Sequence, residues 1–286
     1  MIRRLCIIGV GLIGGSLARA LRKAGVVGEI VGSGRRSEHL QEAVDLGVID
    51  RFDTDAAKAV QGADMVVVCV PLGAMEQVFR TILPALAADA VVTDAGSAKA
   101  SVVNAARAGF GKLPTWFVPG HPIAGTEKSG VAASFAELYQ GRRVILTPLE
   151  NTDPAATAKV QAMWEAAGAQ VQCMGVEHHD DVLAATSHLP HVLAFQMVDT
   201  LARMSDEDEI FRYAAGGFRD FTRIASSDPV MWRDICLAND RAVLKMLERF
   251  RSDLANLAEA IRAGDGAELE RVFRNAKAAR DRHSER

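Results

Sequence analysis

The chain has 286 residues, of which 49% are hydrophobic and 24% charged, and its formal net charge is −3. This composition suits a globular protein of one large or two medium domains, and it argues against binding nucleic acid or an anionic membrane surface through a polybasic patch. The longest apolar runs, such as MVVVCV, fall far short of the about 20 residues that cross a bilayer. The four cysteines stand singly, which favours a reducing, cytoplasmic setting.

The first half of the chain alternates apolar runs with segments of helical periodicity. The strand-like runs are RLCIIGV, EIVGSG, ADMVVVCV, AVVTDAG, TWFVPG, RRVILTP and AQVQCM. Such alternation predicts a parallel, doubly wound sheet with helical crossovers. From Glu177 onward only helical periodicity remains. We therefore predict an α/β plus all-α protein, with an α/β domain over residues 1–174 and a helical domain over residues 175–286. The apolar faces of its long helices pack either against a second chain, in a dimer, or against one another, in an internally packed bundle.

A glycine-rich turn follows the first predicted strand. IIGVGLIGGSLARAL places Gly9, Gly11 and Gly14 in the spacing G-x-G-x-x-G, between a strand and an amphipathic helix. Gly9 permits the turn, Gly11 lets the backbone approach a pyrophosphate, and Gly14 lets the helix pack on the strand. The first helical amides, at Leu12 and Ile13, then face the phosphates. The pattern predicts a Rossmann dinucleotide-binding turn, and the alternative is a tight turn without a ligand.

The end of the second predicted strand bears on the choice of dinucleotide. NAD enzymes usually carry an acidic residue there, which binds the ribose hydroxyls. Here that position falls near Gly34, and its neighbours are Ser33, Arg35 and Arg36. Guanidinium and hydroxyl groups bind a 2′-phosphate, so we predict that NADP is preferred over NAD. The alternative is that both arginines are solvated loop charges.

Three histidines lie in segments that suggest a function. His121 stands in VPGHPIAGTEKSG between prolines and glycines, which predicts a shaped loop rather than a helix or strand. His188 and His191 are three residues apart in SHLPH and share a face if that segment is helical, with Pro190 near a helix start. No carboxylate stands at H-E-x-x-H or similar spacing, so we expect no metal site.

Six motifs together resemble a known family. GVGLIGGSLA, VVVCVPL, DAGSAKA, GHPIAGTEKSG, HDDVLAATSHLPH and GGFRDFTRIASSDPVMW occur in this order, and the resemblance runs from about Arg4 to about Glu248. The sequence resembles the prephenate/arogenate dehydrogenases (cyclohexadienyl dehydrogenases) of tyrosine biosynthesis. The resemblance implies a Rossmann domain joined to a helical domain that forms a homodimer, with the active site between them. It also implies oxidative decarboxylation of arogenate to tyrosine, of prephenate to 4-hydroxyphenylpyruvate, or of both, with hydride transfer to the dinucleotide.

The same resemblance implies roles for individual residues. His121 matches the histidine that accepts the proton of the substrate's C4 hydroxyl, and Ser97 matches a serine beside that histidine and the nicotinamide. Arg223 matches the arginine that pairs with the side-chain carboxylate of the substrate. The other matched positions are Thr126, Glu127, His188 and His191 near the substrate, and Val70 and Pro71 on the adenosine side of the cofactor. The alternative for Glu127 is a structural role, in which its carboxylate accepts hydrogen bonds from N–H groups of its own loop. Which of His188 and His191 touches the substrate stays open.

Two other functions compete with this one. A different NADP dehydrogenase of a small hydroxy acid, of the 6-phosphogluconate or 3-hydroxyacid type, would carry a lysine and an asparagine where this chain has TSHLPH. A nucleotide sensor without activity would need the glycine turn but not His121, Ser97 and Arg223 together. We recognise no chorismate-mutase or regulatory segment, so we expect the minimal, single-activity form. Tyrosine is expected as a competitive inhibitor at most, and the choice between arogenate and prephenate stays open.

Overall fold

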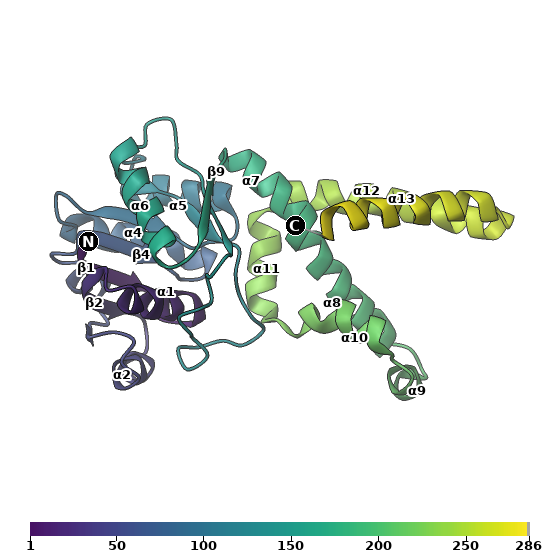
Figure 1. Ribbon diagram of the computed structural model, residues 1–286, viewed down its shortest axis with the longest axis horizontal. Helices are drawn as coiled ribbons and strands as arrows, with labels where there is room; N and C mark the ends of the chain where they lie inside the picture. Colours follow the sequence, from purple (N-terminus) through teal and green to yellow (C-terminus); the bar gives the residue numbers. More distant parts are fainter. Residues whose placement is uncertain (285–286) are drawn as a thin grey trace. The chain divides into compact units, whose positions relative to one another are not determined.

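The computed structural model describes residues 1–284 of the chain (Figure 1). By its internal contacts the chain divides into two compact units. The first is Met1–Asp240, and the second starts at Arg241. The first unit therefore holds the predicted α/β domain together with the earlier part of the predicted helical domain. The division at residue 174, which was expected from composition, stays a prediction.

The first unit is built on a six-stranded parallel sheet. Its strands are β1 (Ile2–Ile8), β2 (Val27–Ser33), β3 (Arg51–Phe52), β4 (Met65–Val68), β5 (Val91–Asp94) and β6 (Phe117–Val118), in the spatial order β3-β2-β1-β4-β5-β6. The connecting helices are α1 (Leu12–Lys23), α2 (Ser37–Asp45), α3 (Ala56–Ala59), η1 (Leu72–Ala74), α4 (Met75–Ile82), η2 (Leu83–Ala85) and α5 (Lys99–Phe110). The predicted doubly wound parallel sheet is confirmed.

Both faces of this sheet are buried, which explains the unbroken apolar runs in the sequence. Successive side chains of β1 point to opposite faces, so Leu5 and Ile7 join one core while Cys6 and Ile8 join the other. Helix α1 and α6 (Pro154–Ala166) pack on the first face, and α4 and α5 cover the second (Figure 1). The carboxyl ends of the strands are thereby left at one edge, where ligands of such sheets bind.

The last strands of the α/β part form a second, smaller sheet, which the sequence did not predict. It consists of β7 (Gly120–Pro122), β8 (Arg143–Leu146) and β9 (Gln170–Cys173); β7 is antiparallel to β8, and β8 is parallel to β9. Strand β6 ends at Val118 because Pro119 follows directly and has no N–H for another ladder bond. His121 therefore lies on a strand, opposite Ile145, and its prediction as a loop residue was wrong. The loop begins after it, at Ile123.

The rest of the chain is helical, as predicted. The elements of the first unit are α7 (Val176–Leu183), η3 (Ala184–His188, a turn of π-helix), α8 (Leu189–Ala202), α9 (Glu207–Arg212), α10 (Gly216–Thr222), η4 (Arg223–Ser226) and α11 (Pro229–Ala238). The second unit holds α12 (Asp240–Ala263) from its second residue onward and α13 (Gly266–Ser284). Pro229 stands in the first turn of α11, where its missing N–H group costs no helical bond. Pro190 directly follows the π-helical turn, inside a helical run that continues from α7 to α8. In the part of the chain described, no helix is long and apolar enough to cross a membrane.

Candidate functional site

The glycine turn between β1 and α1 has the shape of a dinucleotide cradle. Gly9 has φ +98°, and a Cβ there would come within 2.3 Å of the Cys69 carbonyl oxygen. A Cβ on Gly14 would lie 2.5 Å from the Gly9 carbonyl oxygen. A Cβ on Gly11, by contrast, would meet no described atom within 4 Å beyond its chain neighbours. Two glycines are therefore required by the fold, while Gly11 opens onto free space where a pyrophosphate could approach.

The other predicted cofactor positions lie along the same edge. Leu12 and Ile13 begin α1, whose N-cap is Gly11 and therefore has no side chain to bind their amides. Ser33 ends β2 beside the turn, because its carbonyl accepts the Gly9 amide at 2.8 Å. Arg35 and Arg36 follow and are exposed, Val70 and Pro71 follow β4, and Ser97 follows β5. All these residues are placed at the carboxyl ends of parallel strands, so the structure brings them to one side of the sheet.

His121 is held in place by a buried ion pair under its backbone. The carboxylate of Asp94 accepts the amides of Gly96 at 2.7 Å and of Gly120 at 3.1 Å. The ammonium of Lys99 contacts the same carboxylate and donates to the Gly120 carbonyl at 2.6 Å. Both charged side chains are fully buried. Asp94 and Lys99 thus flank Ser97 in the sequence, and both hydrogen-bond the backbone of Gly120, the residue before His121. The same buried ion pair therefore fixes both predicted catalytic residues, Ser97 and His121.

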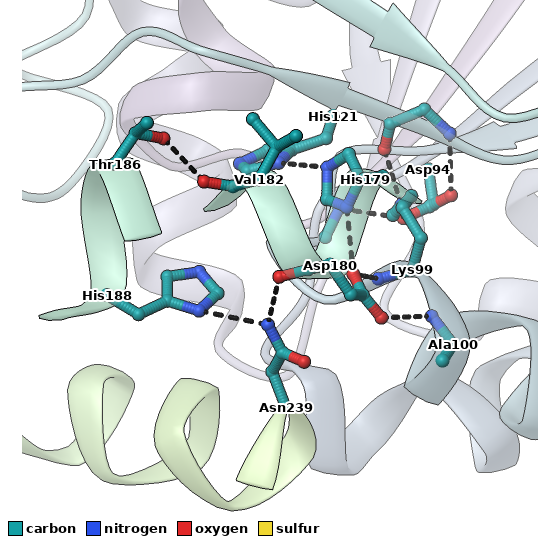
Figure 2. Close-up of polar contacts among 12 residues, drawn as sticks. Asp94, Lys99, Ala100, His121, His179, Asp180, Val182, Thr186, His188 and Asn239 are labelled. Atoms are coloured by element: carbon teal, nitrogen blue, oxygen red, sulfur yellow. Dashed lines mark hydrogen bonds and ion pairs between the residues drawn. The ribbon is translucent and has the colours of Figure 1, made fainter. Parts of the chain in front are cut away.

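The imidazole of His121 heads a chain of hydrogen bonds that reaches into the helical segment (Figure 2). Its Nδ1 lies 2.9 Å from Nε2 of His179, and Nδ1 of His179 lies 2.8 Å from Oδ1 of Asp180. The Asp180 carboxylate also accepts the backbone amides of Lys99 at 2.8 Å and Ala100 at 2.9 Å. These are the first two amides of α5, so Asp180 caps that helix from another element and meets its positive end.

The protonation states of this chain follow from burial and from its hydrogen bonds. Burial disfavours the Asp180 carboxylate, but the bonds from His179, Ala100 and Lys99 outweigh it and lower the pKa of Asp180. Burial also lowers the pKa of His179, against the pull of Asp180. Burial is again the main cause that lowers the pKa of His121 well below its usual value, followed by repulsion from His179, Lys99 and His188. At neutral pH, Asp180 is therefore ionised while both imidazoles are neutral.

The two later histidines have distinct surroundings. His188 is buried, ends the π-helical turn, and has its Nδ1 3.2 Å from Nδ2 of Asn239; the same Asn239 nitrogen donates to the Asp180 carbonyl at 2.9 Å. Burial lowers the pKa of His188 to about 4. His191 is partly buried, donates from Nδ1 to the Ser187 carbonyl at 2.9 Å, and stacks on Trp232 with ring centroids 3.6 Å apart. A π-helical turn inside a helix often marks a functional site, and here it carries His188 into the network.

The residues predicted to bind the substrate carboxylate lie at a more exposed place. Arg223 begins η4, and its Nη1 lies 3.6 Å from Oε2 of Glu127, with both side chains partly exposed. Thr126 is exposed, and its hydroxyl accepts the Lys128 amide at 3.2 Å. The charge of Arg223 also reaches His191, where it adds to burial in lowering the pKa of that imidazole. The structure thus joins the predicted anion-binding arginine to the histidine pair and to the loop that follows His121.

Four residues of this network were not singled out from the sequence: Lys99, His179, Asp180 and Asn239. Asp94, which ends β5, caps the strand end with its carboxylate. The one available signal was the adjacent His–Asp pair in EHHDD, next to the change from strands to helices. Within residues 1–284, no group of three or more His, Cys, Asp or Glu side chains is arranged to hold a metal ion.

Comparison with known sequences gives a consistent family. Family models described as the nucleotide-binding domain and the dimerization domain of prephenate dehydrogenase match residues 17–173 and 175–275. The chain is 42% identical to the cyclohexadienyl dehydrogenase of Zymomonas mobilis, over 97% of this chain and 95% of that protein.

Solved structures agree. A prephenate dehydrogenase from A. aeolicus, in complex with hydroxyphenyl propionate and NAD+, superposes with a TM-score of 0.92 at 41% identity, covering 99% of this chain and 98% of that one. The arogenate dehydrogenase of Synechocystis superposes with a TM-score of 0.82 at 29% identity, covering 98% and 99% of the two chains. The similarity therefore extends over both the α/β part and the helical part.

Proposed function

The chain belongs to the prephenate dehydrogenase family of oxidoreductases in tyrosine biosynthesis, and we propose that it oxidises and decarboxylates prephenate, arogenate or both. The observation that carries the proposal is His121. It is a buried, neutral imidazole on strand β7, and the Gly120 amide before it donates to Asp94 at the carboxyl end of β5. A base of this kind suits removal of a hydroxyl proton while hydride leaves the same carbon.

His121 acts as the proton acceptor of the reaction. The C4 hydroxyl of the substrate gives its proton to the free ring nitrogen of His121, and the C–O bond becomes a carbonyl as hydride departs. The bond between the ring and its carboxylate then breaks, carbon dioxide leaves, and the bonding electrons make the ring aromatic. The phenolate oxygen takes the proton back from His121, so the base is restored in each turnover. The hydroxyl of Ser97 orients the substrate oxygen or the imidazole.

The cofactor is a nicotinamide dinucleotide, which supplies the hydride acceptor when it is bound. Gly9, Gly11 and Gly14 would form its cradle, and the amides of Leu12 and Ile13 would bind its phosphates. The space over Gly11 and the uncapped start of α1 both fit this group. Val70 and Pro71, after β4, would contact its adenosine side.

We further propose that NADP is preferred over NAD. Ser33 ends β2 beside the glycine turn and Arg35 and Arg36 follow it, at the place where the adenosine ribose of such a cofactor binds. The double variant Arg35→Ala/Arg36→Ala is expected to lower kcat/KM with NADP by about 10- to 100-fold and to change kcat/KM with NAD by less than about threefold. Equal losses with both cofactors, or a wild-type preference for NAD, would contradict this preference.

The substrate is held by its side-chain carboxylate at Arg223, which offers a bidentate guanidinium. Thr126, Glu127, His188 and His191 form the remaining wall. His191 has its Nδ1 bound to the Ser187 carbonyl and keeps Nε2 as an acceptor, which would receive the amino group of arogenate. This geometry accommodates arogenate without excluding the keto acid. A product that shares the aromatic ring, such as tyrosine, would compete for the same site.

We also propose a homodimer formed through the helical part and a cytoplasmic setting. Large apolar side chains are exposed on these helices: Leu237, Leu244, Ile261 and Phe273 are each more than half exposed. The four free cysteines support a reducing compartment. Light scattering on the purified protein should give twice the mass of the 30.6 kDa chain.

The function is tested by following nicotinamide reduction and carbon dioxide release with prephenate and with arogenate in separate reactions. We expect turnover with at least one of them, and an aromatic product in equal amount. His121→Asn should keep dinucleotide affinity while kcat falls by about 10²-fold or more. Absence of turnover with both substrates would refute the proposed activity, and an unchanged kcat in the variant would refute the role of His121.

A further inference from the structure

The hydrogen bonds behind His121 determine which of its nitrogens carries the hydrogen. Asp180 accepts the first two amides of α5 and, as a carboxylate, can only accept from His179. Nδ1 of His179 must therefore be the N–H that donates to Oδ1 of Asp180. A neutral imidazole has one N–H, so Nε2 of His179 carries a lone pair. The only hydrogen that can occupy the 2.9 Å contact between the two rings then belongs to Nδ1 of His121.

We propose that His179 and Asp180 are positioning residues that hold His121 in the Nδ1–H tautomer and leave its Nε2 unprotonated as the base. This inference rests on the proposed function. The two residues act through His121, because their hydrogen bonds run to its imidazole, to each other and to the first amides of α5. Without them, a neutral imidazole is free to carry its hydrogen on Nε2, where it could not accept the substrate proton. A His121 in that state is correctly placed and inactive.

The same chain receives the charge that forms on His121 during turnover. When His121 takes the substrate proton, its Nδ1–H still donates to His179, and the ionised Asp180 lies directly behind. The carboxylate therefore opposes the repulsion from the buried Lys99, whose ammonium lies under the neighbouring backbone. The side chains of His121, His179 and Asp180 are all buried, so water does not screen the charge on His121 and the carboxylate stabilises it instead. In a catalytic triad, the Nδ1–H of the histidine base donates directly to a carboxylate. Here the imidazole of His179 lies between the base, His121, and the carboxylate of Asp180.

Two amide variants separate this role from simple packing. His179→Gln places a carbonyl oxygen as many bonds from Cβ as Nε2 of histidine, so it can accept from His121. His179→Asn reaches only as far as Nδ1, so it can donate to Asp180 but cannot reach His121. We expect His179→Asn to lose kcat by about 10²-fold and His179→Gln to lose less than about tenfold, with KM within about threefold of wild type in both. If His179 served only to anchor Asp180, the order of the two variants would be reversed, which would overturn the proposal.

A spectroscopic measurement tests the tautomer without turnover. In protein labelled with ¹⁵N-histidine, the ring nitrogens of His121 are identified by their loss in His121→Asn. The wild type and His179→Gln should show the Nδ1–H form, and His179→Asn should show the Nε2–H form. An Nε2–H form in the wild type, or no change in His179→Asn, would overturn the proposal. Because this readout needs no substrate, it stays valid even if the proposed activity fails.

Control variants guard against unfolding. His178→Asn alters the exposed neighbour of His179 on the same helix and should leave kcat and the His121 signals unchanged. Both His179 variants should keep wild-type dinucleotide affinity, since the glycine cradle lies on a different element. If His179→Asn fails to fold, the comparison rests on His179→Gln and on the tautomer of the wild type. An Nε2–H tautomer in either would contradict the inference.

Discussion

At the scale of single residues, the guanidinium of Arg223 is paired with the carboxylate of Glu127. Their ion pair is 3.6 Å long and partly exposed, so it is weak in water, about 1 kcal/mol at most. With Arg223 in its proposed role, a substrate carboxylate displaces Glu127 to pair with the guanidinium. Glu127→Gln should therefore lower KM by up to about fivefold and leave kcat nearly unchanged, and 0.5 M salt should reduce the difference.

The control for this prediction is the loss of the cation. Arg223→Ala should raise KM by about tenfold or more, since it removes the anion partner itself. Steady-state kinetics of both variants at low and high salt measure the effect. A higher KM in Glu127→Gln would mean that the carboxylate orients Arg223 for the substrate rather than competing with it.

At the scale of elements, the sequence predicted the main sheet and missed the smaller one. Continuous apolar runs and the glycine turn are local signals, and they identified β1, β2, β4 and β5 correctly. The run RRVILTP and the run AQVQCM were also recognised as strands, but which sheet a strand joins depends on partners far away in the chain. The three-residue strand β7 gave no periodicity to detect, because prolines and glycines flank His121. A strand this short forms only because β8 supplies its hydrogen bonds.

The glycine turn allows the structural and the functional need for glycine to be separated. Gly9→Ala should lower the free energy of unfolding by about 2–4 kcal/mol, because the residue has φ +98° and its Cβ would collide with the Cys69 carbonyl. Gly11→Ala has extended backbone and open space, so its stability should stay within about 0.5 kcal/mol of wild type. Its methyl group would instead occupy the cofactor's side of the turn and weaken dinucleotide binding by about tenfold or more.

Urea unfolding and dinucleotide titration distinguish these two outcomes. The matched pair differs by one methyl group at positions two residues apart, so composition cannot explain a difference. A Gly11→Ala protein that binds the dinucleotide like the wild type would show that the backbone does not approach the cofactor at this point.

At the scale of the whole molecule, the site depends on contacts that no sequence window contains. His121 and His179 are 58 residues apart, and Lys99 and Asp180 are 81 apart, yet each pair is joined by a hydrogen bond. The residue types at His121, Ser97 and Arg223 could be predicted from motifs. Their support could not, because Asp180 acts by capping a helix from a different part of the chain. The change from strands to helices at Glu177 was visible in the sequence, while the residues that join the two parts were not.

Burial of neutral histidines makes the fold sensitive to acid. His188 has its pKa lowered from 6.5 to about 4, and burial lowers the pKa of His121, His179 and His191 in the same direction. Between these values the unfolded chain binds protons that the folded chain does not, so stability is full above about pH 6.5 and is lost as the pH falls toward 4. His188 alone should cost about 2 kcal/mol between pH 7.5 and pH 5.

Fluorescence-detected urea unfolding at the two pH values measures this loss. The three tryptophans, Trp116, Trp164 and Trp232, all lie in the first unit, so the signal reports on the part that holds the site. His188→Gln is less stable at pH 7.5, because the Asn239 contact changes, but it should show a pH dependence smaller by about 2 kcal/mol. His178→Gln, at an exposed position, should keep the wild-type dependence. Equal pH dependence in His188→Gln and the wild type would mean that His188 takes up its proton over the same pH range in the folded protein as in the unfolded chain, and that at pH 5 the network around Asp180 carries one more positive charge than its hydrogen bonds indicate.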